Sequence, residues 1–272
     1  SACAAADAPV QLTVGYMPYA SSTWSGIVMR GKKFYEKHLP PGSSVTFASA
    51  LDGAKIAAAL HSGQQQIGYL DDGAAIEAIL DEGLFCHVGF AVGDQPYVIP
   101  CVHARIGQRL YLHGSPASRM LRAIAAGAPV CVTVTLLDGL VLARSAFHHS
   151  VNYRSVVILG TASRVDDAEE RLAALRAIVE HVVPGRWDEA RRPSAAELAQ
   201  TLVVALPISE ASAKVRSGGP RDDAADHALD VWAGVVLLAL LAGAPIPASD
   251  VRAEIAVPAH ALRYERPQRG ER

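Results

Sequence analysis

One stretch of the sequence, residues 110–135, brings together residue types that bind anions. It reads LYLHGSPASRMLRAIAAGAPVCVTVT, in which an apolar strand runs into a His-Gly-Ser turn and a helix is expected to open with Ser118 and Arg119 in its first turn. The first N–H groups of a helix have no partner inside the helix, and the positive end of the helix dipole lies beside them. This stretch therefore predicts a site for a phosphate-bearing ligand.

The side chains at this turn allow two interpretations. The guanidinium of Arg119 offers a planar fork and the hydroxyl of Ser118 a compact donor, and both suit a phosphate. Alternatively, Ser118 is only the N-cap of the helix and Arg119 is a solvated charge. His113, at the strand end just before the turn, is either a hydrogen-bonding residue of the fold or a proton donor or orienting group for a substrate.

The elements that must position this turn are mostly short strands. Apolar, β-branched runs are found at 84–92, 95–104, 109–112, 130–136, 141–145 and 155–165, with turns at 93–94, 106–108 and 138–139. This spacing is typical of hairpins and predicts a closed or nearly closed antiparallel barrel, completed by strands at 202–207 and 232–241. We also expect an amphipathic helix at 167–182 and a polar loop at 214–228.

The N-terminal residues follow a different pattern. Strands are expected at 12–16, 45–49 and 66–70, with helices at 25–38 and 52–62 between them. The order strand, helix, strand, helix, strand predicts a parallel sheet with right-handed crossovers. We therefore expect two domains, 1–73 and 74–272, that join directly within residues 71–76.

Composition argues against several classes of function. The chain of 272 residues has a formal net charge of -2, and its 25 Lys and Arg residues are scattered, so nucleic acid is not an expected partner. The longest uninterrupted apolar run, VWAGVVLLALL at 231–241, is too short to span a bilayer.

The cysteines and the paired histidines do not predict a metal site. The four cysteines show no CxxC spacing, and Cys86, Cys101 and Cys131 lie in strand-like runs where reduced core thiols are expected. His148 and His149 are neighbours, and neighbouring side chains of an extended chain point in opposite directions.

The N-terminal pattern resembles a known family of receptors. The segments VGYMPYASSTWSG and ALHSGQQQIGYLDDGAAI resemble periplasmic solute-binding proteins of the nitrate, sulfonate and taurine ABC transporters, over part of one lobe. The resemblance implies a cleft lined by Tyr19, Ser21, Ser22 and Trp24. The first residues, SACAAADAP, resemble the segment after a bacterial lipoprotein cleavage site, so this part would be exported or lipid-anchored if a signal peptide preceded it.

Residues 75–267 resemble a second family. The segments CHVGFAVGDQPYVIPCVHARIGQRLYLHGSPASRMLRAI and PVCVTVTLLDGLVLARSAFHHSVNYRSVVILG are similar to the pyridoxamine 5'-phosphate oxidase-related flavoproteins, and within them to the nitroimidazole-resistance branch. The resemblance implies an α+β fold, an antiparallel split β-barrel of the FMN-binding type, here preceded by a partial βαβαβ fragment. It also implies a cytoplasmic flavin domain.

The same resemblance implies a cofactor site at a homodimer interface. The strand 97–101 would lie beside the isoalloxazine ring of FMN, unless Pro100 is an ordinary edge proline. The segment 153–155 would reach the flavin across the interface, and Trp232 would either stack near the ring or pack in the core. The implied cofactor-binding residues are Val98, Ile99, Pro100, His113, Gly114, Ser115, Ser118, Arg119, Tyr153, Arg154, Ser155 and Trp232, with His113 as the candidate catalytic residue.

The function implied by this resemblance is that of an FMN-dependent oxidoreductase. It would reduce a small electron-poor acceptor, such as a nitroaromatic compound, with the flavin supplying the redox chemistry. Two alternatives stay open: a flavin- or haem-binding module without turnover, and an exported solute-binding protein that acts through the N-terminal part.

Overall fold

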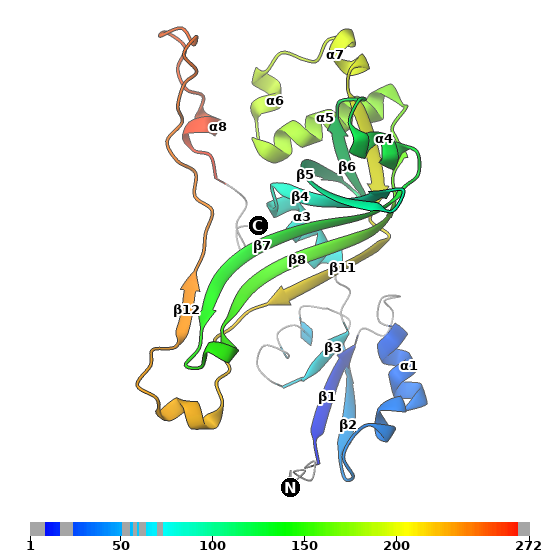
Figure 1. Ribbon diagram of the computed structural model, residues 1–272, viewed down its shortest axis with the longest axis vertical. Helices are drawn as coiled ribbons and strands as arrows, with labels where there is room; N and C mark the ends of the chain where they lie inside the picture. The colour runs from blue at the N-terminus through cyan, green and yellow to red at the C-terminus, as the bar shows by residue number, and fades with distance from the viewer. Residues whose placement is uncertain are drawn as a thin grey trace. The chain divides into compact units, whose positions relative to one another are not determined.

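A computed structural model describes residues 9–16, 24–50, 55–56, 59, 64–69 and 73–265, and the chain divides into two compact units, residues 1–74 and 75–272 (Figure 1).

The N-terminal unit contains a three-stranded parallel sheet. Strand β1 (Gln11–Tyr16) lies between β2 (Ser44–Ser49) and β3 (Ile67–Tyr69), which confirms the predicted parallel arrangement. The helix predicted at 25–38 is instead α1 (Trp24–Lys32) followed by the 3-10 helix η2 (Phe34–Lys37), because Lys33 adopts a left-handed φ of 51°. The helix predicted at 52–62 lies mostly outside the described residues.

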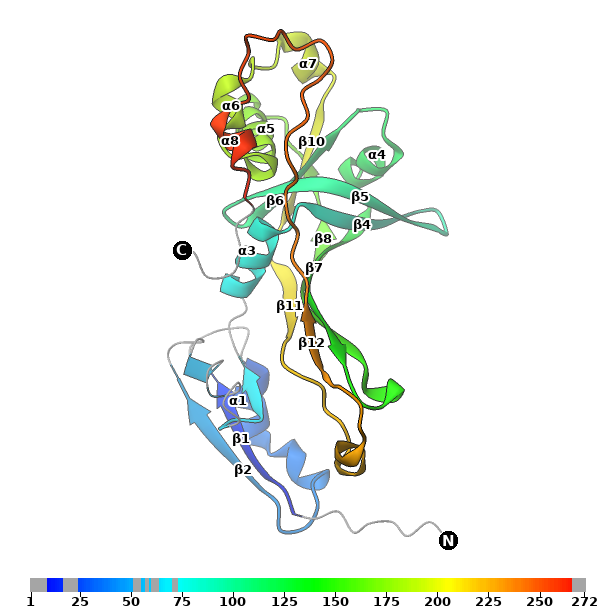
Figure 2. The ribbon, with the colours of Figure 1, turned by 90° about the vertical axis from the view of Figure 1, so that its left-hand side faces the viewer.

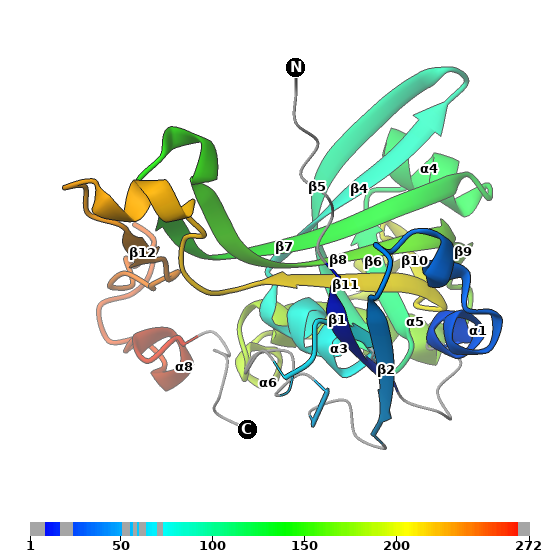
Figure 3. The same ribbon diagram turned by 90° about the horizontal axis from the view of Figure 1, so that it is seen from below.

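The second unit is built on an antiparallel sheet of nine strands, in the order β11-β8-β7-β4-β5-β6-β10-β9, with β12 paired to β7 (Figures 1 and 3). The sheet curls into a half-barrel, which confirms the predicted split-barrel α+β fold. The strands are β4 (Phe85–Val92), β5 (Gln95–Ile106), β6 (Arg109–Gly114), β7 (Pro129–Leu142), β8 (Ser150–Thr161), β9 (Ser163–Arg164), β10 (Leu202–Pro207), β11 (Glu210–Arg216) and β12 (Gly234–Leu237).

Helices close the interior and cover one outer side of this half-barrel. The side chains of α3 (Gly73–Glu82) and α4 (Arg119–Ala125) join the interior core, whereas α5 (Ala168–Val182), α6 (Arg186–Glu189) and α7 (Ala195–Ala199) belong with the outer side of β6 and β10. The remaining helical segments are η3 (Ala146–His148), η4 (Ala224–Ala228) and α8 (Ala259–Leu262).

Alternation along the strands decides which side chains enter the core. Along the central parts of β4, β7 and β8 every second residue points inward and is buried, because successive side chains of a strand face opposite ways. The interior members of these three strands are Cys86, Val88, Phe90, Val130, Val132, Val134, Val156 and Ile158. The outward residues between them are half-buried or exposed.

We call this outward surface the open face. Its members come from β4, β5, β7, β8 and β11, and the cross-strand register places them side by side. The open face comprises Phe85, His87, Val98, Pro100, Val102, Thr133, Leu137, Tyr153, Ser155, Leu159 and Lys214.

Several elements predicted in the second unit also differ from the structure. The predicted turn at 138–139 is a bulge inside β7, so the two strands expected there are one strand of 14 residues. The predicted loop at 214–228 begins inside β11. The run 232–241 does not complete the barrel: it forms β12, four residues at the edge of β7, and Leu237 is 82% exposed.

Candidate functional site

The turn before α4 has the local structure that its sequence predicts. Ser118 is the N-cap of α4, and its Oγ accepts the Leu121 N–H at 3.4 Å. The Oγ of Ser115 accepts the Ala117 N–H at 3.2 Å. The cap at Ser118 and the turn at Ser115 each use the hydroxyl oxygen as an acceptor, but each hydroxyl keeps an O–H that could donate to a phosphate oxygen.

Arg119 is the exposed cation of this turn. Its Nη1 donates to the Tyr97 hydroxyl at 3.1 Å, and the guanidinium carbon lies 5.2 Å from the centre of the Tyr97 ring. The Tyr97 ring is stacked on Phe90 at 5.3 Å between centroids. Stacking and the hydrogen bond therefore hold the guanidinium beside the β4–β5 hairpin.

His113 lies on β6, opposite Val203 of β10. Its Nδ1 is buried and has no hydrogen-bond partner in the part of the chain that the structure describes. Burial lowers the pKa of His113, so the imidazole is neutral at pH 7. Next to it, a Cβ on Gly114 would come within 3.1 Å of Leu121, so glycine lets α4 pack closely here.

The strand predicted to face a ring presents two of its three candidate residues on the open face. Val98 is 65% exposed, and Pro100 is exposed opposite His87 of β4. Ile99 alternates to the other side, opposite the buried Val88. Within the described residues β5 pairs with β6 only from His103 onward, so Pro100 has a strand on one side alone.

Tyr153 and Ser155 also lie on the open face, but Arg154 does not. The Nζ of Lys214 lies 5.7 Å from the centre of the Tyr153 ring. Arg154 points inward and is 8% exposed, where it forms ion pairs with Glu82 at 2.5 Å and Asp138 at 2.7 Å. These two carboxylates hold the guanidinium on the interior side and raise its pKa.

Trp232 is separate from these groups along the chain. It is 66% exposed and precedes β12, where its indole lies over Gly234: a Cβ at Gly234 would be 2.7 Å from the ring. Whether Trp232 contacts a cofactor stays a prediction.

His87 is a site residue that the sequence reasoning missed. Its imidazole is exposed on the open face between Pro100 of β5 and Thr133 of β7. The two-residue turn Gly93-Asp94 fixes this register, because Val92 pairs with Gln95 and each earlier residue then pairs with a later one. Counting back from the turn would have placed His87 beside Pro100.

The described residues contain no group of three or more His, Cys, Asp or Glu that could hold a metal ion. No helix among them is long and apolar enough to cross a membrane.

Comparison with known proteins fits this geometry. The family model described as pyridoxamine 5'-phosphate oxidase matches residues 72–215, more than half of the chain. The chain belongs to the pyridoxamine 5'-phosphate oxidase family. The matched range ends within β11 and begins after the parallel sheet, so the resemblance of the N-terminal unit to solute-binding proteins stays a prediction.

Two solved structures are similar over most of their length. The flavocytochrome Anf3 from Azotobacter vinelandii is 39% identical with a TM-score of 0.67, and the match covers 71% of this chain and 90% of that chain. The FAD and heme binding protein from Mycobacterium smegmatis is also 39% identical with a TM-score of 0.67, and the match covers 69% of this chain and 92% of that chain. No curated protein matches.

A third structure is similar at a lower level. It is a 5-nitroimidazole antibiotic resistance protein by description, from Bacteroides thetaiotaomicron, with 24% identity, a TM-score of 0.45 and coverage of 53% of this chain and 84% of that chain. This match does not decide the branch within the family, which stays a prediction.

Proposed function

We propose that this chain binds a flavin nucleotide at a homodimer interface and passes reducing equivalents to a small electron-poor acceptor. The observation that carries the proposal is the exposed guanidinium of Arg119, which Tyr97 holds on one side of β5, while the exposed apolar residue Val98 lies on the other side of the same strand. A flavin has an anionic phosphate, which Arg119 suits, and a flat apolar ring, which the open face suits. Among the described residues β5 pairs with β6 only from His103 onward, so a flavin that contacts both would pass over the unpaired edge of β5. The names of the two relatives at 39% identity, a flavocytochrome and an FAD and heme binding protein, support a flavin.

The residues present fit the cofactor as follows. Arg119 would hold the phosphate with the hydroxyls of Ser115 and Ser118, and Val98 and Pro100 would contact the ring. When bound, the flavin would supply hydride and one-electron chemistry, while the protein binds it, orients it and excludes water. We propose His113, kept neutral by burial, as a group that orients substrate by a hydrogen bond. Burial disfavours the imidazolium form that the alternative role, proton donor, would need.

The test is a titration of the purified protein with FMN and with FAD, followed by visible absorbance and flavin fluorescence. We expect tight binding of one of them, and mass spectrometry of the cofactor released on denaturation tells which. A protein that gains no flavin absorbance contradicts the proposal. Oxidation of NADH or NADPH with a nitroaromatic acceptor then separates an enzyme from a binding module.

Substitution of one arginine tests the phosphate contact. Because a hydrogen bond to a charged group contributes about 1.5–3 kcal/mol, Arg119→Gln should raise the flavin Kd by roughly 10- to 150-fold. Arg122→Gln is the matched control, since Arg122 is exposed on the same helix one turn later. Equal affinities for the two variants would remove Arg119 from the site.

Haem is a second candidate cofactor, and His87 is the observation that favours it. The His87 imidazole is exposed among Phe85, Val98 and Pro100, and no hydrogen bond or ion pair engages it within the described residues. An imidazole on an apolar surface could ligate a haem iron while the apolar neighbours contact the porphyrin. Both relatives named above are haem proteins by name.

Absorbance also tests this second candidate. Protein reconstituted with haem should show a Soret band that shifts or weakens in His87→Ala and does not change in His227→Ala, which alters an exposed histidine of η4. An unchanged spectrum in His87→Ala would rule out His87 as the axial ligand. A loss of flavin affinity in the same variant would instead place His87 beside the flavin.

A further inference from the structure

The C-terminal arm, residues 229–258, contains an apolar segment that the described residues of the split-barrel unit leave uncovered. Residues 231–248 read VWAGVVLLALLAGAPIPA and contain no charged or hydroxyl side chain. Every residue from 236 to 256 is exposed. Leu237, Leu240, Leu241 and Ile246 are between 70% and 92% exposed. Soluble protomers rarely leave so continuous an apolar surface in water, so something covers the arm.

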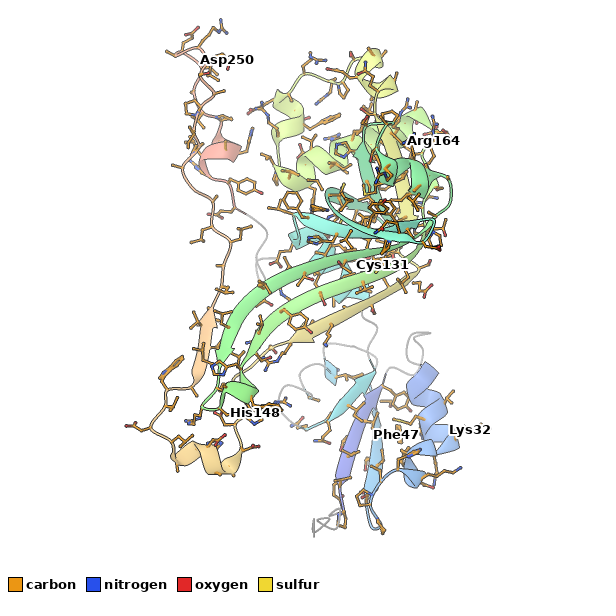
Figure 4. All side chains as sticks on the ribbon, viewed as in Figure 1. Lys32, Phe47, Cys131, His148, Arg164 and Asp250 are labelled. Atoms are coloured by element: carbon orange, nitrogen blue, oxygen red, sulfur yellow. The ribbon has the colours of Figure 1, made fainter. Side chains whose placement is uncertain are left out.

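Both ends of the arm are attached to the split-barrel unit. At its start β12 pairs with β7, and a last hydrogen bond joins the Leu238 N–H to the Asp138 carbonyl oxygen. After its end, the Tyr264 hydroxyl donates to the Val182 carbonyl oxygen, and His260 lies 3.6 Å from Glu189. Between these attachments the arm runs as one extended segment, with Asp250 at its far turn (Figures 1, 2 and 4).

The arm makes no ladder of its own between these attachments. Among the described residues, 239–247 take part in no backbone hydrogen bond. Holding an extended segment in one conformation costs about 1–2 kcal/mol per residue in backbone entropy. Burial against another surface would offset such a cost, and the described residues of the split-barrel unit leave 236–256 exposed.

An apolar space separates the arm from the strands nearest to it. A cavity of about 370 Å³ is lined by Ala242, Gly243 and Pro245 of the arm, and by Phe85 and Val102 of the open face. The end of α5 and the segment around Tyr264 complete its wall. The arm and the part of the open face around Phe85 and Val102 therefore line one apolar concavity, which a protruding apolar surface would fill.

We propose that the arm clasps a second copy of this chain, whose surface fills this concavity and covers the arm. The inference rests on the homodimer of the proposed function and names the segment that forms it. A standard interface takes about 20–30 residues from each partner, and the arm alone supplies that number. In a two-fold dimer each copy contributes both an arm and a concavity, so the contact closes on itself.

The backbone of the arm argues against a lipid surface as its cover. Hydrocarbon cannot accept the N–H groups of an extended segment, and each unsatisfied group there costs several kcal/mol. A protein partner can pair with them along a strand, as in strand addition. A pelleting assay with vesicles of phosphatidylcholine and phosphatidylglycerol tests the lipid alternative.

The principal experiment measures mass and hydrogen exchange on the full chain. Wild type should have the mass of two chains by light scattering, and the amides of 239–247 should be protected at high protein concentration and lose protection on dilution. Leu240→Asp/Leu241→Asp should have the mass of one chain and unprotected arm amides. Leu172→Asp, at an exposed position of α5, is the control and should stay dimeric.

The outcomes separate this inference from the proposed function. If wild type and the double variant are both dimeric and their arm amides are unprotected, the arm does not form the dimer interface. That result contradicts this inference and leaves the homodimer of the proposed function in place. A monomeric wild type overturns both. Vesicle binding by wild type that the double variant loses, with no dimer in solution, would assign the arm to a membrane and overturn the proposal. Circular dichroism of the double variant should match wild type, since both leucines are at least 70% exposed.

Discussion

Arg154 and its two neighbours show how strand geometry separates residues that a motif groups together. The family resemblance takes Tyr153, Arg154 and Ser155 as one cofactor segment. In β8, Tyr153 and Ser155 face outward, whereas Arg154 faces the interior, where it pairs with two carboxylates. Period-two alternation is readable from the sequence. The ion-pair partners of Arg154 cannot be predicted from the sequence, because Glu82 comes from α3 and Asp138 from a bulge in β7.

This interior ion-pair group predicts a large effect of one substitution. Arg154→Gln leaves Glu82 and Asp138 without the cation that separates them, so we expect a loss of about 3–5 kcal/mol in the free energy of unfolding. Urea unfolding measures it. Arg164→Gln removes an exposed strand ion pair with Asp166 and should cost less than about 1 kcal/mol. Similar losses in the two variants would mean that burial adds nothing to the Arg154 pairs.

Burial also predicts the reactivity of a cysteine at the residue scale. Desolvation, with a smaller effect of the neighbouring Cys101, raises the pKa of Cys86 to about 12. The nucleophile in alkylation is the thiolate, so at pH 8 folded Cys86 should not react with iodoacetamide. Mass spectrometry after a timed pulse should find Cys86 modified only when urea is present. Modification at the same rate with and without urea would show that β4 opens readily.

At the scale of elements, the sequence predicted hairpins better than long strands. Gly93, with a φ of 59°, turns β4 into β5 as the Gly-Asp pair predicts. The Asp138-Gly139 pair has similar local chemistry but sits in a bulge, because β7 continues along β8 and receives β12 on its other edge. Those partners lie far away in the sequence. The sequence predicts a barrel strand at 232–241, but β12 has only four residues. The reason is related: an apolar run does not show whether residues of its own chain bury it.

The bulge glycine predicts how β12 is held. A Cβ at Gly139 would lie 2.9 Å from Val235 Cγ1 and 3.0 Å from the Val236 carbonyl oxygen. Overpacking costs about 1–3 kcal/mol, so Gly139→Ala should speed amide exchange in β12 by roughly 5- to 150-fold. Gly219→Ala is the control, because a Cβ there meets nothing within 4 Å. Unchanged exchange in Gly139→Ala would mean that β12 is held by other contacts.

At the scale of the molecule, the proposed cofactor site on the open face and the uncovered arm pose the same physical question. Both are apolar surfaces that the described residues of the split-barrel unit leave exposed. Membership of the family could be predicted from the motifs at 86–124 and 129–160, because they carry the strand, turn and helix that define the fold. The arm could not, because its role depends on a surface that is absent from one chain.

If formation of one dimer covers both the arm and the proposed cofactor site, flavin affinity must depend on dimerisation. A ligand that binds only the dimer stabilises it by mass action, so its apparent affinity falls when the protein dissociates. We therefore expect Leu240→Asp/Leu241→Asp, which leaves Arg119, Val98 and Pro100 in place, to bind flavin at least about tenfold more weakly, equivalent to about 1.4 kcal/mol. Leu172→Asp should keep the wild-type Kd. Fluorescence titrations at protein concentrations above and below the dimer Kd measure this. A monomeric double variant with undiminished flavin affinity would place the whole cofactor site within one protomer and leave the arm with a purely structural role.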